Sequence, residues 1–165
     1  MRVLGVDCGS AVTGVGILES EGRGARLLHY RAIRPARSLA FASRLEHIHR
    51  ELEKLVARYR PDSIAVEQVF LAYNVKSAMQ LSQVRGVVLL AAARAGVPVS
   101  EYSALTVKRS VVGYGRAEKH QVQRMVQRLL CLPAPPEPED AADALAVALC
   151  HLFAETTRRR WARSS

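Results

Sequence analysis

Two aspartates stand three residues apart in EPEDAADALAVALCH, a stretch over residues 137–151 that is otherwise rich in Ala, Leu and Val. Residues with this spacing lie on the same face of a helix, so Asp140 and Asp143 should point in one direction. Because both come early in the predicted helix, the helix dipole favours their ionised form. First-turn aspartates are also common as simple partners of the dipole, so the pair alone does not establish a site.

Two further acids, Asp7 and Glu67, each end a short apolar segment that is typical of a buried strand. If the two strands are parallel neighbours, their ends lie about 4.8 Å apart. The carboxyl ends of strands are where sites form in open α/β sheets. Two carboxylates held this close repel each other, and one takes up a proton unless a cation lies between them. Taken alone, each acid has the simpler explanation of a solvated or capping residue.

Four acids that converge on one place predict a metal centre. Ligands that are all oxygen, with no Cys or His cluster, indicate a hard cation such as Mg²⁺ or Mn²⁺. Two such ions about 3.5–4 Å apart suit an in-line attack of water on a phosphodiester. We therefore expect Asp7, Glu67, Asp140 and Asp143 to hold two Mg²⁺ ions, for which Mn²⁺ can substitute. Glu101, at the end of another predicted strand, could contact the ligands of this centre without binding an ion itself.

The strands that must position these acids are predicted from short apolar segments separated by turn residues. Glycines between the first three segments predict an antiparallel meander. The fourth segment is reached through a long helix, which predicts a strand parallel to a neighbour through a right-handed crossover. The fold class is therefore α/β, a five-stranded mixed sheet with three antiparallel strands, then parallel strands, flanked by helices. The expected strands cover residues 1–7, 13–18, 25–33, 63–66 and 97–102.

The expected helices are amphipathic or are bounded by capping residues. The segment GYGRAEK, residues 113–119, is predicted to be a mobile basic loop. We expect one domain over residues 1–155 and a disordered basic tail over residues 156–165. The expected helices cover residues 38–59, residues 75–95, a segment after Ser103, residues 120–130, and a last helix from Pro138 through Phe153.

The second half of the helix expected over residues 75–95, VVLLAAARA, is apolar on nearly all sides, so it must be covered on more than one side. One explanation is contact with the sheet on one face and with a second subunit on the other. The alternative is a central helix that is covered by its own chain alone. The sequence favours neither explanation.

The charge of the chain favours a polyanionic partner, because 24 Lys and Arg against 15 Asp and Glu give a net charge of +9. Charge alone does not distinguish nucleic acid, a membrane surface and a protein that is merely cationic. The longest strongly apolar run, residues 87–93, is far shorter than the roughly 20 residues of a spanning helix. We therefore expect a cytoplasmic protein with no membrane partner.

The cysteines are three in number, scattered, and without a CxxC spacing, which argues against a zinc site or a disulfide framework. Cys8 follows Asp7 directly and is either a reactive thiol or a small buried side chain.

Five motifs carry a resemblance to a known family. They are VLGVDCGSAVTGVGIL, AVEQVF, SAMQLSQVRGVVLLAAA, VKRSVVGYGRAEKHQV and DAADALAVALCH, in this order. Together they resemble the RuvC-type Holliday junction endonucleases, crossover junction endodeoxyribonucleases of the ribonuclease H-like superfamily, over roughly residues 1–153. The resemblance implies a ribonuclease H-like fold and a metal-dependent homodimer. It further implies symmetric paired cuts in four-way DNA junctions, a role in homologous recombination and DNA repair, and a branch-migration complex as a partner.

The resemblance also assigns roles to individual residues. The catalytic and metal-binding carboxylates of the family match the same four acids that the spacing indicates. Lys108 and Lys119 match basic residues that act near the scissile phosphate, although either could be an ordinary surface lysine. Phe70 matches an aromatic residue used against junction bases, where stacking is worth about 1–3 kcal/mol per base. From their positions alone, Tyr73, Arg85 and Arg116 are further candidates for DNA contact.

Three other functions remain open at this point. A ribonuclease H-like nuclease could act on RNA–DNA hybrids or on other branched DNA. A sugar-kinase or actin-like ATPase also begins with a strand, D-x-G and a hairpin, but it needs two such domains, and this chain has room for one. A junction-binding protein without catalysis is the third.

Overall fold

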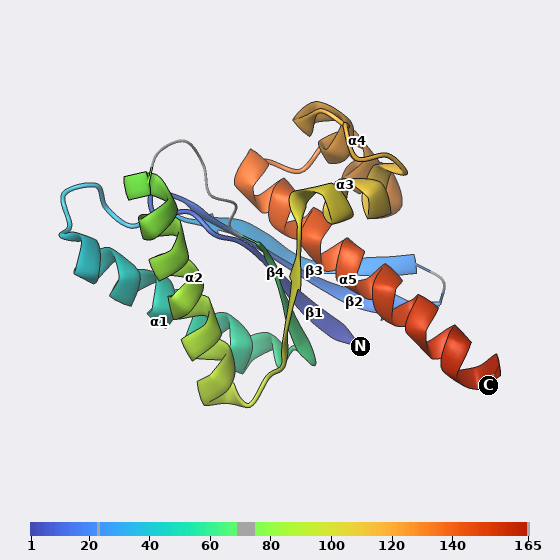
Figure 1. Ribbon diagram of the computed structural model, residues 1–165, viewed down its shortest axis with the longest axis horizontal. Helices are drawn as coiled ribbons and strands as arrows, with labels where there is room; N and C mark the ends of the chain where they lie inside the picture. Colours follow the sequence, from blue (N-terminus) through green and yellow to red (C-terminus); the bar gives the residue numbers. More distant parts are fainter. Residues whose placement is uncertain (23, 69–74, 165) are drawn as a thin grey trace.

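The computed structural model describes residues 1–22, 24–68 and 75–164. Within them, a five-stranded mixed sheet lies between two groups of helices (Figure 1). The strands are β1 (Arg2–Asp7), β2 (Thr13–Glu21), β3 (Gly24–Ile33), β4 (Ser63–Glu67) and β5 (Val99–Tyr102). Their order across the sheet is β3-β2-β1-β4-β5. The β1, β2 and β3 strands pair antiparallel, whereas β4 and β5 continue parallel to β1, which confirms the predicted sheet.

The central strand β1 is covered on both faces, which explains its nearly continuous apolar sequence. Val3, Leu4 and Val6 have no exposed surface. Leu4 and Val6 belong to the apolar core on one face of the sheet, and Val3 belongs to the core on the other face. The two faces of the sheet therefore carry separate apolar cores, and the charged end of β1 is left at the edge between them.

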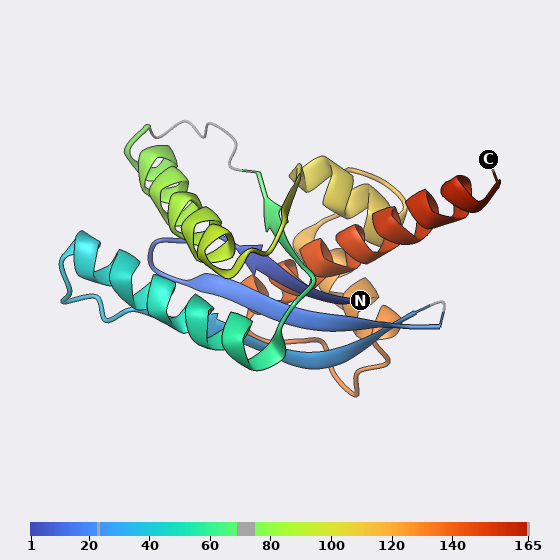
Figure 2. The same ribbon diagram turned by 90° about the horizontal axis from the view of Figure 1, so that it is seen from below.

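Helices α1 (Phe41–Tyr59) and α2 (Val75–Ala95) cover one face of the sheet. Helices α3 (Ala104–Val112), α4 (Lys119–Leu129) and α5 (Glu139–Ser164) cover the other. Figure 2 shows the two groups on opposite sides of the strands. Gly96 ends α2 with a φ of +66°, and the amide of Val97 donates to the carbonyl of Ala92. Because the amide of Val97 still bonds to the end of α2, β5 begins at Val99, two residues later than predicted.

The described residues of this chain cover the α2 helix on one side only. Val84, Val88 and Ala91 are buried against the sheet and α1, whereas Leu90 is 52% exposed and Met79 is 60% exposed. The apolar character of this helix therefore does not come from burial inside its own chain on every side. Among the described residues, the exposure of Leu90 and Met79 favours the explanation with a second subunit over a helix covered by its own chain alone.

The α5 helix runs further than the sequence predicted. It continues to Ser164, so the expected helix end at Phe153 is corrected, whereas the division into a domain over residues 1–155 and a disordered tail over residues 156–165 stays a prediction. The hydroxyl of Thr156 donates to the carbonyl of Leu152 at 2.8 Å, and the hydroxyl of Thr157 donates to the carbonyl of Phe153 at 3.0 Å. An ion pair of 2.6 Å between residues 155 and 158 also spans one turn and supports the helix.

Candidate active site

The strand register brings the first two predicted acids to one edge of the sheet. Val6 of β1 pairs with Val66 of β4 in a parallel ladder, so Asp7 and Glu67 are the next residues on adjacent strands. Immediately after β1, the hydroxyl of Thr13 donates to the carbonyl of Gly9 at 2.7 Å, which holds the turn between β1 and β2. The strand ends thus place both carboxyls at the carboxyl edge of the parallel strands, as predicted.

Glycine brings α5 against the same edge. Asp7 pairs with Gly14 on β2, and a Cβ atom built at Gly14 would lie 1.8 Å from the carbonyl oxygen of Asp140. Along the same helix, a Cβ at Gly5 would lie 2.1 Å from the carbonyl oxygen of Ala144. Only residues without a side chain permit this approach of helix backbone to strand backbone. The start of α5 is therefore fixed directly above the strand end that carries Asp7.

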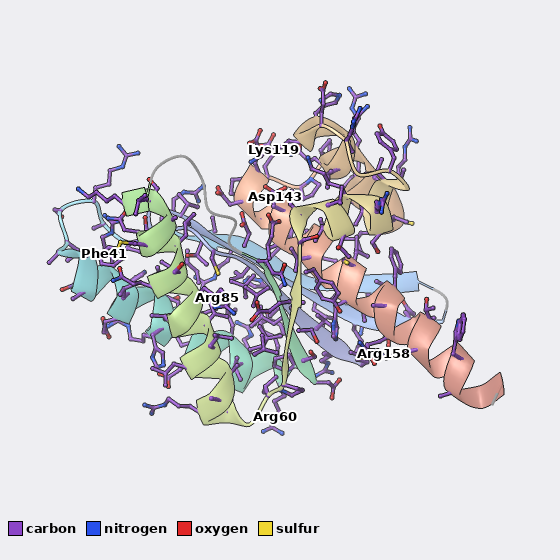
Figure 3. All side chains as sticks on the ribbon, viewed as in Figure 1. Phe41, Arg60, Arg85, Lys119, Asp143 and Arg158 are labelled. Carbon is purple, nitrogen blue, oxygen red and sulfur yellow. The ribbon has the colours of Figure 1, made fainter. Side chains whose placement is uncertain are left out.

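A hollow of about 240 Å³ collects most of the predicted catalytic residues, and we call it the carboxylate hollow. Figure 3 shows Lys119 and Asp143, two of its lining residues, near each other. Asp140 is not among the residues that line the hollow, but its charge is close enough to raise the pKa of Asp7. The carboxylate hollow is lined by Asp7, Glu67, Asp143, Lys108 and Lys119, with Ala104, Val107, Val122 and Ala146 as its apolar part.

The acids of the hollow hold their protons more tightly than free carboxylic acids. Burial, followed by repulsion from Asp143, Glu67 and Asp140, raises the pKa of Asp7 to about 7. Burial and the charge of Asp143 raise the pKa of Glu67. Burial also raises the pKa of Asp143 itself, although the neighbouring ammonium of Lys119 opposes the shift. Clustered, buried carboxyls with raised pKa values mark a site where a positive charge is needed.

Lys119 is positioned by the start of α4. Its side-chain Nζ lies 3.4 Å from Oδ2 of Asp143, and the carboxylates around it raise the pKa of the ammonium. A reciprocal capping arrangement joins Glu118 and Gln121, in which the amide of Glu118 donates to Gln121 Oε1 at 2.8 Å. Sequence reasoning missed this cap and began the helix one residue late, although the E-x-x-Q spacing could have indicated it.

The donor set fits a hard divalent cation. The convergent groups are carboxylates, their charges repel each other, and the part of the chain described here adds no Cys or His to the hollow. Among those described residues, no three acidic, His or Cys side chains are yet close enough together to bind one ion. The carboxyls are thus near enough to perturb each other's protonation, and Lys119 contacts one of them, Asp143.

The remaining candidates are placed differently. Phe70 and Tyr73 lie outside the described residues. Arg85 forms an ion pair with Glu101, which joins α2 to β5, and both side chains are about two-thirds buried. Glu101 pairs with Val66, one position before Glu67, so it lies beside the strand that carries the second acid. Arg116 is exposed between α3 and α4.

Cys8 is a buried side chain, as one of the two explanations expected. Burial and the charge of Asp7 raise the pKa of its thiol to about 12, so it stays protonated. A thiol in that state is a poor nucleophile, which argues against a reactive role. Among the described helices, none has the length and apolar composition needed to cross a membrane.

Comparison with known proteins decides the family. A sequence model described as crossover junction endodeoxyribonuclease RuvC matches residues 3–151. The chain belongs to the RuvC family. The crossover junction endodeoxyribonuclease RuvC of Ruminiclostridium cellulolyticum is 50% identical, over 92% of this chain and 91% of the relative. The RuvC of Acidobacterium capsulatum is 52% identical, over 99% of this chain and 100% of the relative.

The fold also agrees with a solved RuvC structure. Thermus thermophilus RuvC in complex with Holliday junction substrate superposes with a TM-score of 0.90 at 36% identity, over 94% of each chain. The ribonuclease H-like sheet predicted from the sequence is therefore confirmed as the fold of this RuvC-family chain.

Proposed function

We propose that the protein is a structure-selective endodeoxyribonuclease that resolves four-way DNA junctions by paired symmetric cuts, in homologous recombination and DNA repair. The observation that carries the proposal is the carboxylate hollow, in which Asp7, Glu67 and Asp143 meet Lys108 and Lys119. The names of the RuvC relatives and the Holliday junction in the Thermus complex support junction DNA as the substrate.

Two Mg²⁺ ions, or Mn²⁺ in their place, are the cofactor that we infer for the four carboxylates Asp7, Glu67, Asp140 and Asp143. Such ions, when bound, make a water molecule more acidic and neutralise the leaving oxygen of a phosphodiester. Lys119 occupies a position at the mouth of the hollow, where its ammonium can contact a phosphate oxygen in place of Asp143. Lys108, whose charge lowers the pKa of Glu67, adds positive charge on the α3 side.

A homodimer through α2 is the assembly that we infer. Val75, Met79 and Leu90 are exposed apolar side chains on this helix, on the opposite face of the sheet from α5. Burial of such a stripe against a second copy of α2 removes it from water. A two-fold axis then presents two carboxylate hollows to two equivalent strands of a junction. A branch-migration complex as partner and a cytoplasmic location complete the proposal.

Cleavage of a synthetic four-way junction tests this function. The protein is incubated with the junction in Mg²⁺, in Mn²⁺ and in EDTA, beside a linear duplex and an RNA–DNA hybrid of the same sequence. We expect paired cuts in the junction with either metal and none in EDTA. Preferential cleavage of the hybrid would instead assign the hollow to a nuclease of RNA–DNA hybrids.

A further inference from the structure

A second hollow, of about 570 Å³, lies between α3 and the C-terminal half of α5, and we call it the α3–α5 groove. Its size is in the range of pockets that bind small ligands or the anchoring side chain of a peptide. Most of its wall is apolar or uncharged, and it includes Tyr102, Thr106, Ser110, Cys150, Phe153 and Trp161.

The groove is separate from the carboxylate hollow, although both use the same two helices. On α3, Val107 and Lys108 line the hollow, whereas Thr106 and Ser110 line the groove. On α5, the hollow uses Asp143 and Ala146, and the groove begins at Cys150, about 6 Å further along at 1.5 Å per residue. Figure 3 shows Asp143, which lines the hollow, and Arg158, which lines the groove, at distant positions along α5.

Aromatic side chains form the outer part of the groove. Phe153, Thr157 and Trp161 follow each other at intervals of four along α5, so they lie on one face of the helix. Trp161 is 76% exposed, and this end of the helix projects past the sheet in Figures 1 and 2. Large aromatic side chains in a concave surface are the usual anchors of protein–protein contacts.

The charge at this end of α5 selects an acidic occupant. Among the described residues that line the groove, Arg158 carries the only charge, and its side chain is 76% exposed despite its ion pair with Glu155. In the sequence, Arg159, Arg160 and Arg163 follow on the same helix, and no acid occurs after Glu155. The groove therefore combines an uncharged wall with one described cation, Arg158, in a segment whose sequence is strongly basic.

A duplex is a poorer match to this surface than a peptide. Binding of DNA depends on cations that are distributed along the phosphates, and the wall of the groove offers uncharged side chains instead. A peptide can fill the concave wall with an apolar side chain and complement Arg158 with carboxylates.

We propose that the α3–α5 groove is a docking site for a partner protein, which inserts a bulky apolar side chain beside Phe153 and Trp161 and places acidic side chains beside Arg158. This site is independent of the nuclease activity proposed above, because none of the catalytic residues lines it.

Selection from a random peptide library displayed on phage tests the proposal on the full-length protein. Ser110→Arg fills the groove, and Trp161→Ala removes an aromatic side chain that is 76% exposed. Ser43→Arg, on the exposed side of α1, adds the same charge as Ser110→Arg away from the groove and is the matched control. Equal thermal unfolding of all variants confirms that they fold.

We expect the wild type and Ser43→Arg to enrich peptides that combine an aromatic residue or leucine with flanking Asp or Glu. Synthetic peptides of that consensus should bind Ser110→Arg and Trp161→Ala about tenfold more weakly, the loss typical of an anchor side chain. The proposal is overturned if the wild type enriches no such peptide, or if the peptides bind both groove variants as tightly as the wild type.

Binding of a fluorescent four-way junction in EDTA separates a protein partner from a DNA arm. Arg158→Gln and Trp161→Ala should leave the dissociation constant of the junction within about twofold of the wild type. A groove that contacts no phosphate releases no counterions from the DNA and so adds nothing to its affinity. A larger loss of junction affinity would assign the groove to DNA and would also overturn the proposal.

Discussion

The Nζ atom of Lys119 lies 3.4 Å from Oδ2 of Asp143, which joins the first residue of α4 to the start of α5 at the mouth of the carboxylate hollow. The lysine side chain is 70% exposed, so solvent screens the ion pair and its contribution to stability is small. Its effect on protonation is larger, because its charge opposes the rise in the pKa of Asp143 and of Asp7.

Replacement of Lys119 by Ala should therefore reduce activity far more than stability. We expect the rate of junction cleavage in Mg²⁺ to fall by about 10²-fold, in the range for loss of one group that stabilises transition-state charge. Stability should change by less than about 1 kcal/mol in a urea titration. Lys54→Ala, which removes an equally exposed ion pair on α1, is the control. A cleavage rate equal to that of the control would remove Lys119 from the site.

Asp7→Asn should abolish cleavage and preserve or strengthen junction binding, because it removes a ligand and a charge that repels phosphate. Loss of binding together with cleavage would contradict this. A cleavage rate that the substitution leaves unchanged would instead mean that the hollow around Asp7 does not catalyse cleavage, even if the protein binds junctions there. Binding is measured in EDTA by fluorescence anisotropy and cleavage in Mg²⁺, with Glu46→Gln on the exposed side of α1 as the control.

The same variant tests the raised pKa of Asp7. A carboxyl whose pKa rises from 3.8 to about 7 on folding stabilises the protein below pH 3.8, and this contribution is lost as the pH rises through 7. At about pH 8 in EDTA, Asp7→Asn should therefore be more stable than the wild type by about 1–2 kcal/mol, and the difference should shrink towards about pH 5. Stability is measured by thermal unfolding at each pH. A difference that stays constant from about pH 5 to about pH 8 would contradict the raised pKa of Asp7.

Gly14→Ala should displace the start of α5 from the sheet. The new methyl group would meet the carbonyl oxygen of Asp140, which lies 1.8 Å from its position. We expect a loss of about 3 kcal/mol or more in the free energy of unfolding, because the contact is between two backbones that cannot rotate away. Gly24→Ala is the control, since its nearest contact is 3.8 Å away. Equal stability of the two variants would show that the helix does not depend on this approach.

Leu90→Asp should convert a dimer into monomers. The side chain is 52% exposed in the single chain, so a charge there is tolerated by the fold but not by a buried interface between two copies of α2. The mass in solution is measured by light scattering, and Leu39→Asp, at another exposed leucine, is the control. A dimer that persists in Leu90→Asp at the wild-type concentration would exclude this face.

The meeting of Asp7, Glu67 and Asp143 at one hollow could be predicted from sequence because it follows from local rules. Asp7 and Glu67 each end a strand, and the long helix between the strands requires a parallel crossover that aligns those ends. Asp140 and Asp143 share a helix face by spacing alone.

The contacts that depend on how elements dock could not be predicted in the same way. The pairing of Lys119 with Asp143 depends on where α4 rests against α5, and the pairing of Arg85 with Glu101 depends on the path of α2 over β5. The end of α5 was missed for another reason. The arginine-rich sequence after Glu155 suggested a disordered tail, but hydroxyl and ion-pair contacts hold the helix past Phe153 as far as Arg158, and the helix runs on to Ser164.

The glycine contacts between α5 and the strands have a consequence for how this enzyme family tolerates change. Where helix and sheet meet main chain to main chain, no side chain acts as a spacer whose size sets the gap. Apolar residues elsewhere in either core can then be exchanged for larger or smaller ones while the acids on the helix keep their alignment with the acids on the strands. The alignment of these acids therefore depends on main-chain contacts rather than on the size of a core side chain.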